Sequence, residues 1–275
     1  MHRNLHPQLC PLVPQTQAMR FRIRLSYNGA GFHGWQIQPR DPSVQEHIEK
    51  ALSMLLKEEI SITGAGRTDT FVNAVNYIAH FDSHPLTEAE ADWLRCKLNA
   101  ILPAGIVVHE VSMVEEGFHA RFDASDREYS YFLHRKKDPF IGDRSYLCTF
   151  PLDVEEMNRA CAYLLGKHDF KCFEKTGGGN RTSVCEVRYA GWKTYVPDHV
   201  RLLGYPAEEG DYLVFTIRAD RFLRNMVRAV TGTLIEIGRG RKPASWMEEL
   251  IRTGTRSDAG QSVPGSPLFL DNVKY

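Results

Sequence analysis

Strand patterns and helix patterns alternate along the whole chain, and this alternation most constrains the fold. The segment 20–27, RFRIRLSY, places an apolar residue at every second position from Phe21 to Tyr27. A period of two predicts a strand with one buried and one polar face, as found in antiparallel or mixed sheets. Further strands are predicted at 75–81, 105–111, 127–135, 183–192 and 212–219.

Helices are predicted between these strands by their starting residues. Ser43 with Glu46, and Thr87 with Glu90, form capping-box patterns, and apolar residues follow at helical spacing. Asp153 opens a similar segment in the second half, where Cys161 falls on the apolar face. Two more helices are predicted at 222–237 and 244–252, and loops at 176–180 and 206–210.

The interleaving predicts an α+β protein of two similar lobes, with antiparallel-rich sheets flanked by helices. We place the lobe boundary near 112–117, so that 19–112 forms an N-terminal lobe and 113–275 a C-terminal lobe. Residues 1–18 contain three prolines and no clear period. They are interpreted as a disordered extension, or as sequence upstream of a natural start at Met19.

Composition narrows the function classes. No apolar run approaches the roughly 18 residues that a membrane-spanning helix needs. The six cysteines form no C-x-x-C pair, which argues against structural zinc and favours a reducing cytoplasm. Lys+Arg and Asp+Glu are both 34, so a nucleic-acid partner requires a local basic surface. The chain has neither a phosphate-binding P-loop nor a serine nucleophile elbow, which favours cofactor-free chemistry.

The segment 64–74, GAGRTDTFVNA, contains the first candidate for chemistry. Asp69 follows a strand and a Gly-x-Gly turn, where a carboxylate could act as nucleophile or base. The glycines would permit unusual dihedral angles and close backbone approach. The alternative is an exposed loop in which Arg67 and Asp69 form a local ion pair.

Arg228 is the second candidate, within the predicted helix FLRNMVRAVTG. One interpretation is a solvated basic stripe, because Arg224 and Arg228 are four residues apart and share a helix face. The other is a buried arginine that needs an anionic partner. Asp69 would supply that partner, and the pair would keep the carboxylate ionised and oriented.

Tyr129 and the basic clusters also allow two interpretations. Alternating tyrosines on a strand are typical of a core, but a flat ring also stacks on a displaced base. Basic clusters occur at Arg20, Arg22 and Arg24, at 135–137 and at 239–242. Each cluster alone is typical of a solvated face; gathered on one side of the molecule, they would contact phosphates.

Seven segments, in order and spacing together, resemble the TruA-type tRNA pseudouridine synthases from about Met19 almost to the C-terminus. They are YNGAGFHGWQIQP, SVQEHIEKAL, GAGRTD, FHARFDASDREYSYFL, HDFKCF, FLRNMVRAVTGTLIEIG and PLFL. The resemblance implies a cofactor-free and metal-free isomerase that detaches uracil from ribose and rejoins it through carbon 5. It implies two lobes around a central basic cleft, and a homodimer across which tRNA lies. The implied targets are uridines at about positions 38 to 40, in the anticodon stem-loop, recognised largely by RNA shape.

The resemblance also implies roles for particular residues. The essential aspartate of the family falls on Asp69 and its neighbouring arginine on Arg67. The stacking tyrosine falls on Tyr129, the arginine that pairs with the aspartate on Arg228, and a late apolar pocket residue on Leu268.

The chain departs from the family pattern directly after this aspartate. The family usually has glycine, valine and histidine where this chain has Phe71, Val72 and Asn73. If the glycine takes a positive φ, a phenylalanine would be strained there. This departure motivates an alternative function, a non-catalytic RNA-binding paralogue or one that acts on a different RNA. A glycoside hydrolase built on Asp69 would need a second carboxylate, and none stands out.

Overall fold

The computed structural model describes residues 18–177 and 182–275. The expected disordered extension at 1–18 lies outside these residues except for Ala18, and so do residues 178–180 of the expected loop at 176–180.

The described residues form strands and helices in alternation along the chain. The strands are β1 (Met19–Tyr27), β2 (Ile62–Gly64), β3 (Asn73–Ser83), β4 (Ile106–Met113), β5 (Asp126–His134), β6 (Tyr146–Leu147), β7 (Gly166–Asp169), β8 (Val184–Thr194), β9 (Tyr212–Ala219) and β10 (Leu268–Lys274). The α-helices are α1 (Val44–Leu56), α2 (Glu88–Ile101), α3 (Val154–Ala162), α4 (Asp198–Leu203), α5 (Met226–Gly238) and α6 (Trp246–Thr253).

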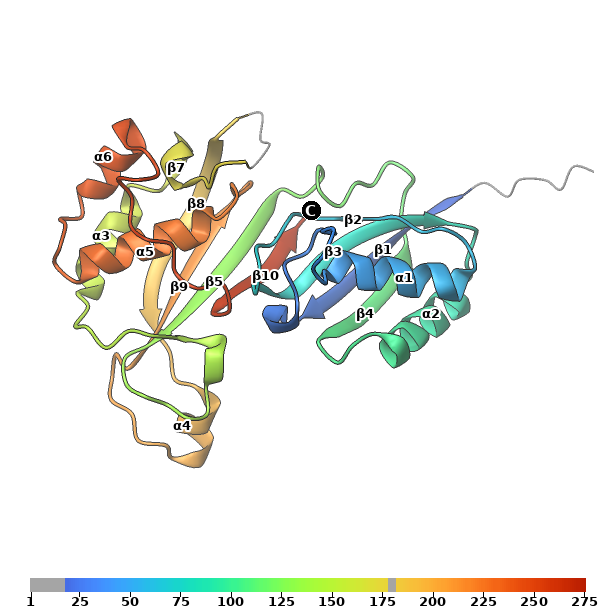
Figure 1. The fold of residues 1–275 in the computed structure, drawn as a ribbon, viewed down its shortest axis with the longest axis horizontal. Coiled ribbons are helices and arrows are strands. Elements are labelled where there is room, and N and C mark those ends of the chain that lie inside the picture. The colour runs from blue at the N-terminus through green and yellow to red at the C-terminus, as the bar shows by residue number, and fades with distance from the viewer. Residues whose placement is uncertain (1–17, 178–181) are drawn as a thin grey trace, which may run out of the picture.

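One mostly antiparallel sheet runs through both halves of the chain, in the order β4-β1-β3-β10-β5-β9-β8-β7. β2 pairs with β3 and β6 pairs with β5 at its sides. The last strand, β10, lies at the centre, parallel to β3 and antiparallel to β5 (Figure 1). The sequence patterns predicted sheets for two lobes; the strands form a single sheet because the end of the chain returns between the halves.

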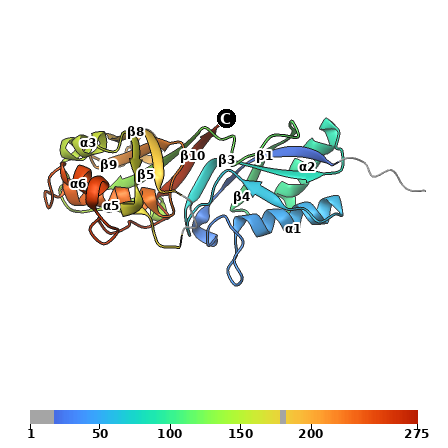
Figure 2. The same ribbon diagram turned by 90° about the horizontal axis from the view of Figure 1, so that it is seen from above.

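The helices divide between the two halves of this sheet. α1 and α2 lie beside β1 to β4, whereas α3, α5 and α6 lie beside β5 to β9 (Figure 2). Each group covers its own cluster of buried apolar side chains. Leu270 from β10 belongs to the cluster of the first half, and Val72 belongs to that of the second. Each half therefore contributes a residue to the core of the other.

The three helix starts predicted from capping residues are confirmed. The side chains of Ser43, Thr87 and Asp153 each accept a hydrogen bond from the backbone N–H three residues later. The predicted helix at 222–237 begins later than expected, at Met226. Asn225, just before it, takes a left-handed conformation with φ 65° that ends the helical path toward the N-terminus.

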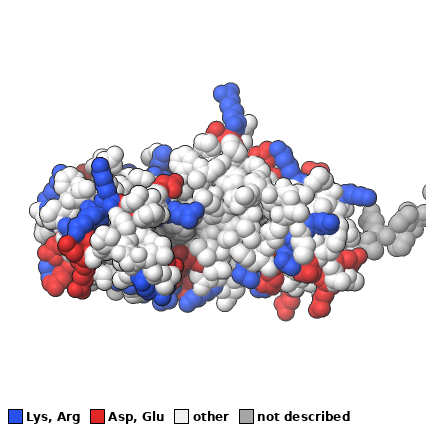
Figure 3. Space-filling model, turned by 90° about the horizontal axis from the view of Figure 1, so that it is seen from below, with Lys and Arg blue, Asp and Glu red and all other residues white. Residues whose placement is uncertain are grey.

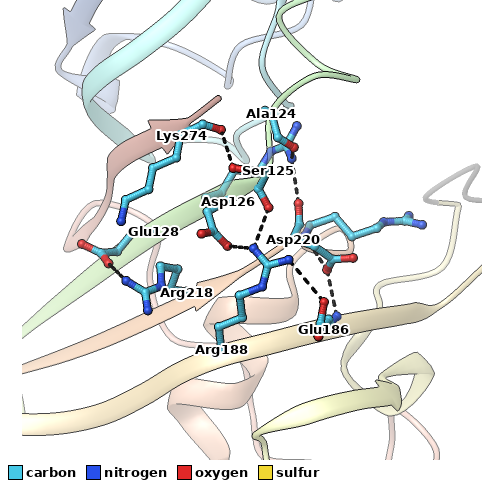
Figure 4. A network of polar contacts seen from close by, with 11 residues as sticks. Ala124, Ser125, Asp126, Glu128, Glu186, Arg188, Arg218, Asp220 and Lys274 are labelled. Carbon is cyan, nitrogen blue, oxygen red and sulfur yellow. Dashed lines mark hydrogen bonds and ion pairs between the residues drawn. The ribbon is translucent and has the colours of Figure 1, made fainter.

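A polar network fastens the segment that joins the two halves to the ends of β8, β9 and β10 (Figure 4). Arg188 donates to the Ser125 carbonyl at 3.0 Å and also pairs with Asp126. Ser125 N–H in turn donates to the Lys274 carbonyl at 2.8 Å. These bonds hold the end of β10 against β5. Within the described residues, no helix is long and apolar enough to cross a membrane.

Candidate active site

The loop between β2 and β3 carries Asp69 and is held from several sides. Ala65 N–H donates to the Ile78 carbonyl at 2.8 Å, and Trp35 N–H reaches the Thr68 carbonyl at 3.4 Å. The Thr68 hydroxyl hydrogen-bonds to the Tyr27 hydroxyl at 2.9 Å. The residues just before Asp69 are therefore held against β1, against β3 and against the loop that contains Trp35.

The two glycines before Asp69, Gly64 and Gly66, differ in whether their surroundings leave room for a side chain. A Cβ on Gly64 would lie 2.1 Å from the Tyr77 hydroxyl, so the packing of that ring excludes any side chain. A Cβ on Gly66 would meet nothing within 4 Å. Neither residue has a positive φ. The expected unusual dihedral angles are therefore absent at both positions. Gly64 is required by its contact with Tyr77.

Asp69 and Arg228 meet across the two halves, as the sequence predicted. Arg228 Nη1 lies 3.8 Å from Asp69 Oδ2, and both side chains are only about a quarter exposed, at 23% and 25%. Arg228 Nε donates to the Val263 carbonyl at 2.8 Å, which directs the guanidinium. The partner of Asp69 is thus this distant arginine. No ion pair between Arg67 and Asp69 occurs in the described part of the chain, so that alternative is wrong.

Burial raises the pKa of the Asp69 carboxyl above its ordinary value. The positive charges of Arg228, Arg224 and Lys175 oppose this rise. The Asn225 backbone N–H also donates to the carboxylate. The left-handed turn at Asn225 places this donor at the start of α5, and asparagine is among the residues that best tolerate that conformation. Asn225 was not predicted from the sequence as a site residue. The signal that could have indicated it is that asparagine tolerates a left-handed conformation.

Tyr129 lies on β5 opposite Leu270 of β10 and Ile217 of β9. Its ring packs against both apolar clusters and meets Phe222 edge to face, with 5.2 Å between centroids. Burial raises the pKa of the Tyr129 hydroxyl, and the neighbouring Asp69 charge raises it further. Tyr131, two residues later, is fully buried core. Tyr129 therefore lies at the seam between the halves, beside Asp69.

The other two predicted site residues differ in exposure. Arg67 is exposed at the edge of the loop. Leu268 is 3% exposed and packs in the cluster of the second half, at the start of β10. The structure therefore brings Asp69, Arg228 and Tyr129 together, with Arg67 at the rim and Leu268 in the apolar wall.

Arg127, which sequence reasoning did not single out, holds the site together. Its guanidinium donates to four backbone carbonyls, those of Ala65 in the Asp69 loop, Arg121, Ala124 and Asp220. These carbonyls come from both halves of the chain. Arg127 thus fixes the Asp69 loop against β5, two residues before Tyr129.

A pocket of about 750 Å³ opens beside Arg228. Its lining includes Arg228, Lys175, Arg256 and the serine hydroxyl of Ser262. Arg256 donates to the Ser262 hydroxyl at 2.6 Å and to the Gly260 carbonyl at 3.1 Å. Within the described residues, neither Lys175 nor Arg256 forms an ion pair with a carboxylate. The pocket is therefore suited to an anion.

The basic clusters picked from the sequence are mostly neutralised. Arg20 pairs with Asp82 at 2.8 Å and Arg22 with Glu110 at 2.7 Å, across neighbouring strands. Lys136 pairs with Glu208 and Asp211, and Arg239 and Arg241 pair with Glu236. On the face in Figure 3, positive and negative side chains are interspersed at both ends, and the middle is largely uncharged. Lys175 and Arg256, which form no ion pair with a carboxylate within the described residues, lie instead in the pocket beside Arg228.

The departure after Asp69 has two physical outcomes. Phe71 takes φ 67°, so the strain expected for a side chain at this position is confirmed; such backbone costs about 1–3 kcal/mol. Asn73 is buried, accepts from Gly29 N–H at 2.8 Å, and donates to the Ser266 and Leu268 carbonyls at 2.6 and 3.3 Å. Asn73 thus joins the loop after β1 to the entrance of β10.

Comparisons with known proteins identify the family of the chain. The family model described as tRNA pseudouridine synthase matches residues 160–275. The tRNA pseudouridine synthase A of Parabacteroides distasonis is 45% identical over 257 residues, 93% of this chain and 96% of the relative. That of Bacteroides fragilis is 42% identical over 93% of this chain and 96% of the relative. The chain therefore belongs to the tRNA pseudouridine synthase family and is an isomerase.

Proposed function

We propose that the chain isomerises uridine to pseudouridine in the anticodon stem-loop of tRNA, at about positions 38 to 40. In this reaction the N1–C1′ bond breaks and a C5–C1′ bond forms, while C5 loses a proton and N1 gains one. Atoms and charge balance without a cofactor. The observation that carries the proposal is the part-buried Asp69 carboxylate, oriented by Arg228 and the Asn225 N–H beside Tyr129.

Asp69 acts at the sugar, either by attack on C1′ or by removal of a sugar proton. Both routes need the ionised carboxylate, and the surrounding cations favour that form. The target uridine leaves the RNA stack at a cost of a few kcal/mol. Stacking on Tyr129 returns about 1–3 kcal/mol. Arg67, exposed at the rim, fills the vacated space or contacts a phosphate, and Leu268 supports the apolar wall of the pocket.

The cationic pocket beside Arg228 holds RNA phosphates in this proposal. Lys175 and Arg256 line this pocket from the second half of the chain, and Arg67 is exposed in the Asp69 loop of the first half. We treat 19–112 and 113–275 as two lobes whose seam, near Asp69 and Tyr129, forms a basic cleft for the RNA. β10 crosses between the lobes and keeps their spacing constant.

We also propose that the protein works as a homodimer in the cytoplasm, with tRNA lying across both subunits. α4 and its flanking loops project from the sheet (Figure 1). Their apolar side chains are largely exposed, at 61% for Val196, 68% for Leu202 and 81% for Leu203. Phe140, from the loop between β5 and β6, contacts the rings of His199 and Tyr205 and is 69% exposed. Such a patch favours burial against a second copy. Sedimentation of the wild type and of Leu203→Asp tests this, because the variant should shift toward monomer.

The alternative, a non-catalytic RNA-binding protein, was motivated by Phe71 and Asn73. These residues leave the contact between Asp69 and Arg228 in place. Asn73 even adds hydrogen bonds that hold the adjoining loops. The site therefore favours the enzyme.

Release of tritium from 5-tritiated uridine in tRNA tests the proposed reaction directly. We expect release by the purified protein, and pseudouridine missing from the anticodon arm in cells that lack the gene. RNA binding without tritium release would support the RNA-binding alternative. An unchanged pseudouridine map in those cells would overturn the proposed substrate.

A further inference from the structure

Phe71 combines a strained backbone with an exposed ring. Its φ is 67°, and its side chain is 44% exposed, whereas the next residue, Val72, is 1% exposed. Bulky residues rarely take this conformation. Burial of the ring in either core does not offset the backbone strain. Packing within the chain therefore does not explain why this residue is phenylalanine.

The surroundings of Phe71 impose its backbone conformation. Phe71 N–H reaches the Phe32 carbonyl at 3.3 Å. A Cβ on Gly29 would lie 2.4 Å from the Val72 carbonyl oxygen, and one on Gly265 would lie 2.4 Å from that of Thr70. The segments that contain Gly29 and Gly265 therefore pack closely against the backbone of this turn. A glycine would fit the turn without strain, so the turn itself does not require phenylalanine.

Phe71 belongs to the same backbone turn as the reacting residue Asp69. Val72 N–H donates to the Asp69 carbonyl at 3.1 Å, so Asp69 and Phe71 belong to one turn. Their Cα atoms are within about 7 Å of each other, because they are two positions apart in the chain. The ring of His33, itself 40% exposed, lies 5.9 Å from that of Phe71. Two exposed rings from separate loops therefore meet at the edge of the site.

We propose that Phe71, with His33, forms a stacking platform for the base next to the target uridine in the substrate RNA. This inference rests on the proposed function. Tyr129 lies deeper, packed against both cores, and serves the target uridine. Bases stack on exposed aromatic rings regardless of sequence, and the exposed cation Arg67, in the same loop as Phe71, suits the backbone of the same strand. The strained ring thus positions RNA and takes no part in the chemistry.

Phe71→Gly separates the role of the ring from that of the backbone. It should raise Tm, because glycine relieves the positive φ, and raise KM for tRNA about tenfold with kcat little changed. A tenfold loss lies within the range of base–aromatic stacking. Phe71→Tyr should keep the wild-type KM. With 2-aminopurine next to the target uridine in an anticodon stem-loop, the emission change on binding should disappear in Phe71→Gly and remain in Phe71→Tyr.

Lys57→Gly is the matched control. Lys57 also has a positive φ, 58°, but it follows the last residue of the 13-residue helix α1. Such a helix is about 20 Å long, and its other end lies beside the loop that carries His33. The control should raise Tm and leave KM unchanged.

An unchanged KM and emission in Phe71→Gly would overturn the stacking platform, and so would a fall in kcat alone. Wild-type protein that releases no tritium refutes the proposed reaction instead. The emission experiment measures binding, so it still tests the platform in that case.

Discussion

The arginines of β1 and the cations around Asp69 differ in what neutralises them. Arg20 and Arg22 lie in a conspicuous sequence cluster, but carboxylates on the neighbouring strands β3 and β4 pair with them. Lys175 and Arg256 are isolated in the sequence, and the fold gathers them beside Arg228, where neither pairs with a carboxylate of the described segments. In a chain of zero net charge, free positive charge is therefore located by the pairing in the fold.

Replacing Asp69, the carboxylate beside these cations, is expected to have the largest effect and is the strongest test of the comparison. Asp69→Asn should lower tritium release at least about a thousandfold. Because burial raises the pKa of Asp69, the fold disfavours its ionised form, and a neutral amide should leave Tm unchanged or higher. Thermal unfolding and tritium release check the two outcomes. If the variant kept half of the wild-type activity, Asp69 would have no direct role in the reaction.

Arg228→Gln and Arg22→Gln compare an arginine from each group. We expect Arg228→Gln to lower kcat about a hundredfold and Arg22→Gln less than twofold. Activity needs ionised Asp69, so it falls as pH drops through the raised pKa of that carboxyl. Loss of the Arg228 charge raises this pKa further, which moves the acid limb of the kcat–pH profile to higher pH. Identical acid limbs in both variants would contradict the assigned pair.

Lys175→Gln should weaken tRNA binding through a phosphate contact. The slope of log Kd against log salt concentration should fall by about 0.7–0.9, the value for one phosphate. Lys136→Gln is the control, because Lys136 is already paired with Glu208 and Asp211. Equal slopes for the two variants would show that the pocket beside Arg228 contacts no phosphate.

The smallest effect is expected when one of the paired β1 arginines is replaced and the stability of the protein is measured. Arg22→Gln should lower the free energy of unfolding by less than about 1 kcal/mol, because its ion pair with Glu110 is more than a third exposed. Urea denaturation measures this change. A loss above about 2 kcal/mol would mean that the β1 arginines are structural residues and would weaken the comparison.

The predictable part of the site came from local patterns. The strand at Phe21 to Tyr27 and the helix start at Ser43 follow from periodicity and capping alone. Asp69 and Arg228 stood out because a carboxylate after a glycine turn, and an arginine in an apolar helix, each need an explanation. β10 was missed as a strand because a register shift between Leu270 and Asn272 interrupts its alternation.

The sequence by itself determined the alternation of strands and helices, the helix starts and the candidates for chemistry, because these depend on residues within one or two turns of each other. Only the tertiary structure decided that the strands form one sheet with β10 at its centre. It also decided that Arg127 holds the Asp69 loop, and which cations stay unpaired. The physical reason is that strand pairing and charge neutralisation join groups far apart in the chain. A local sequence pattern does not indicate which distant groups will meet.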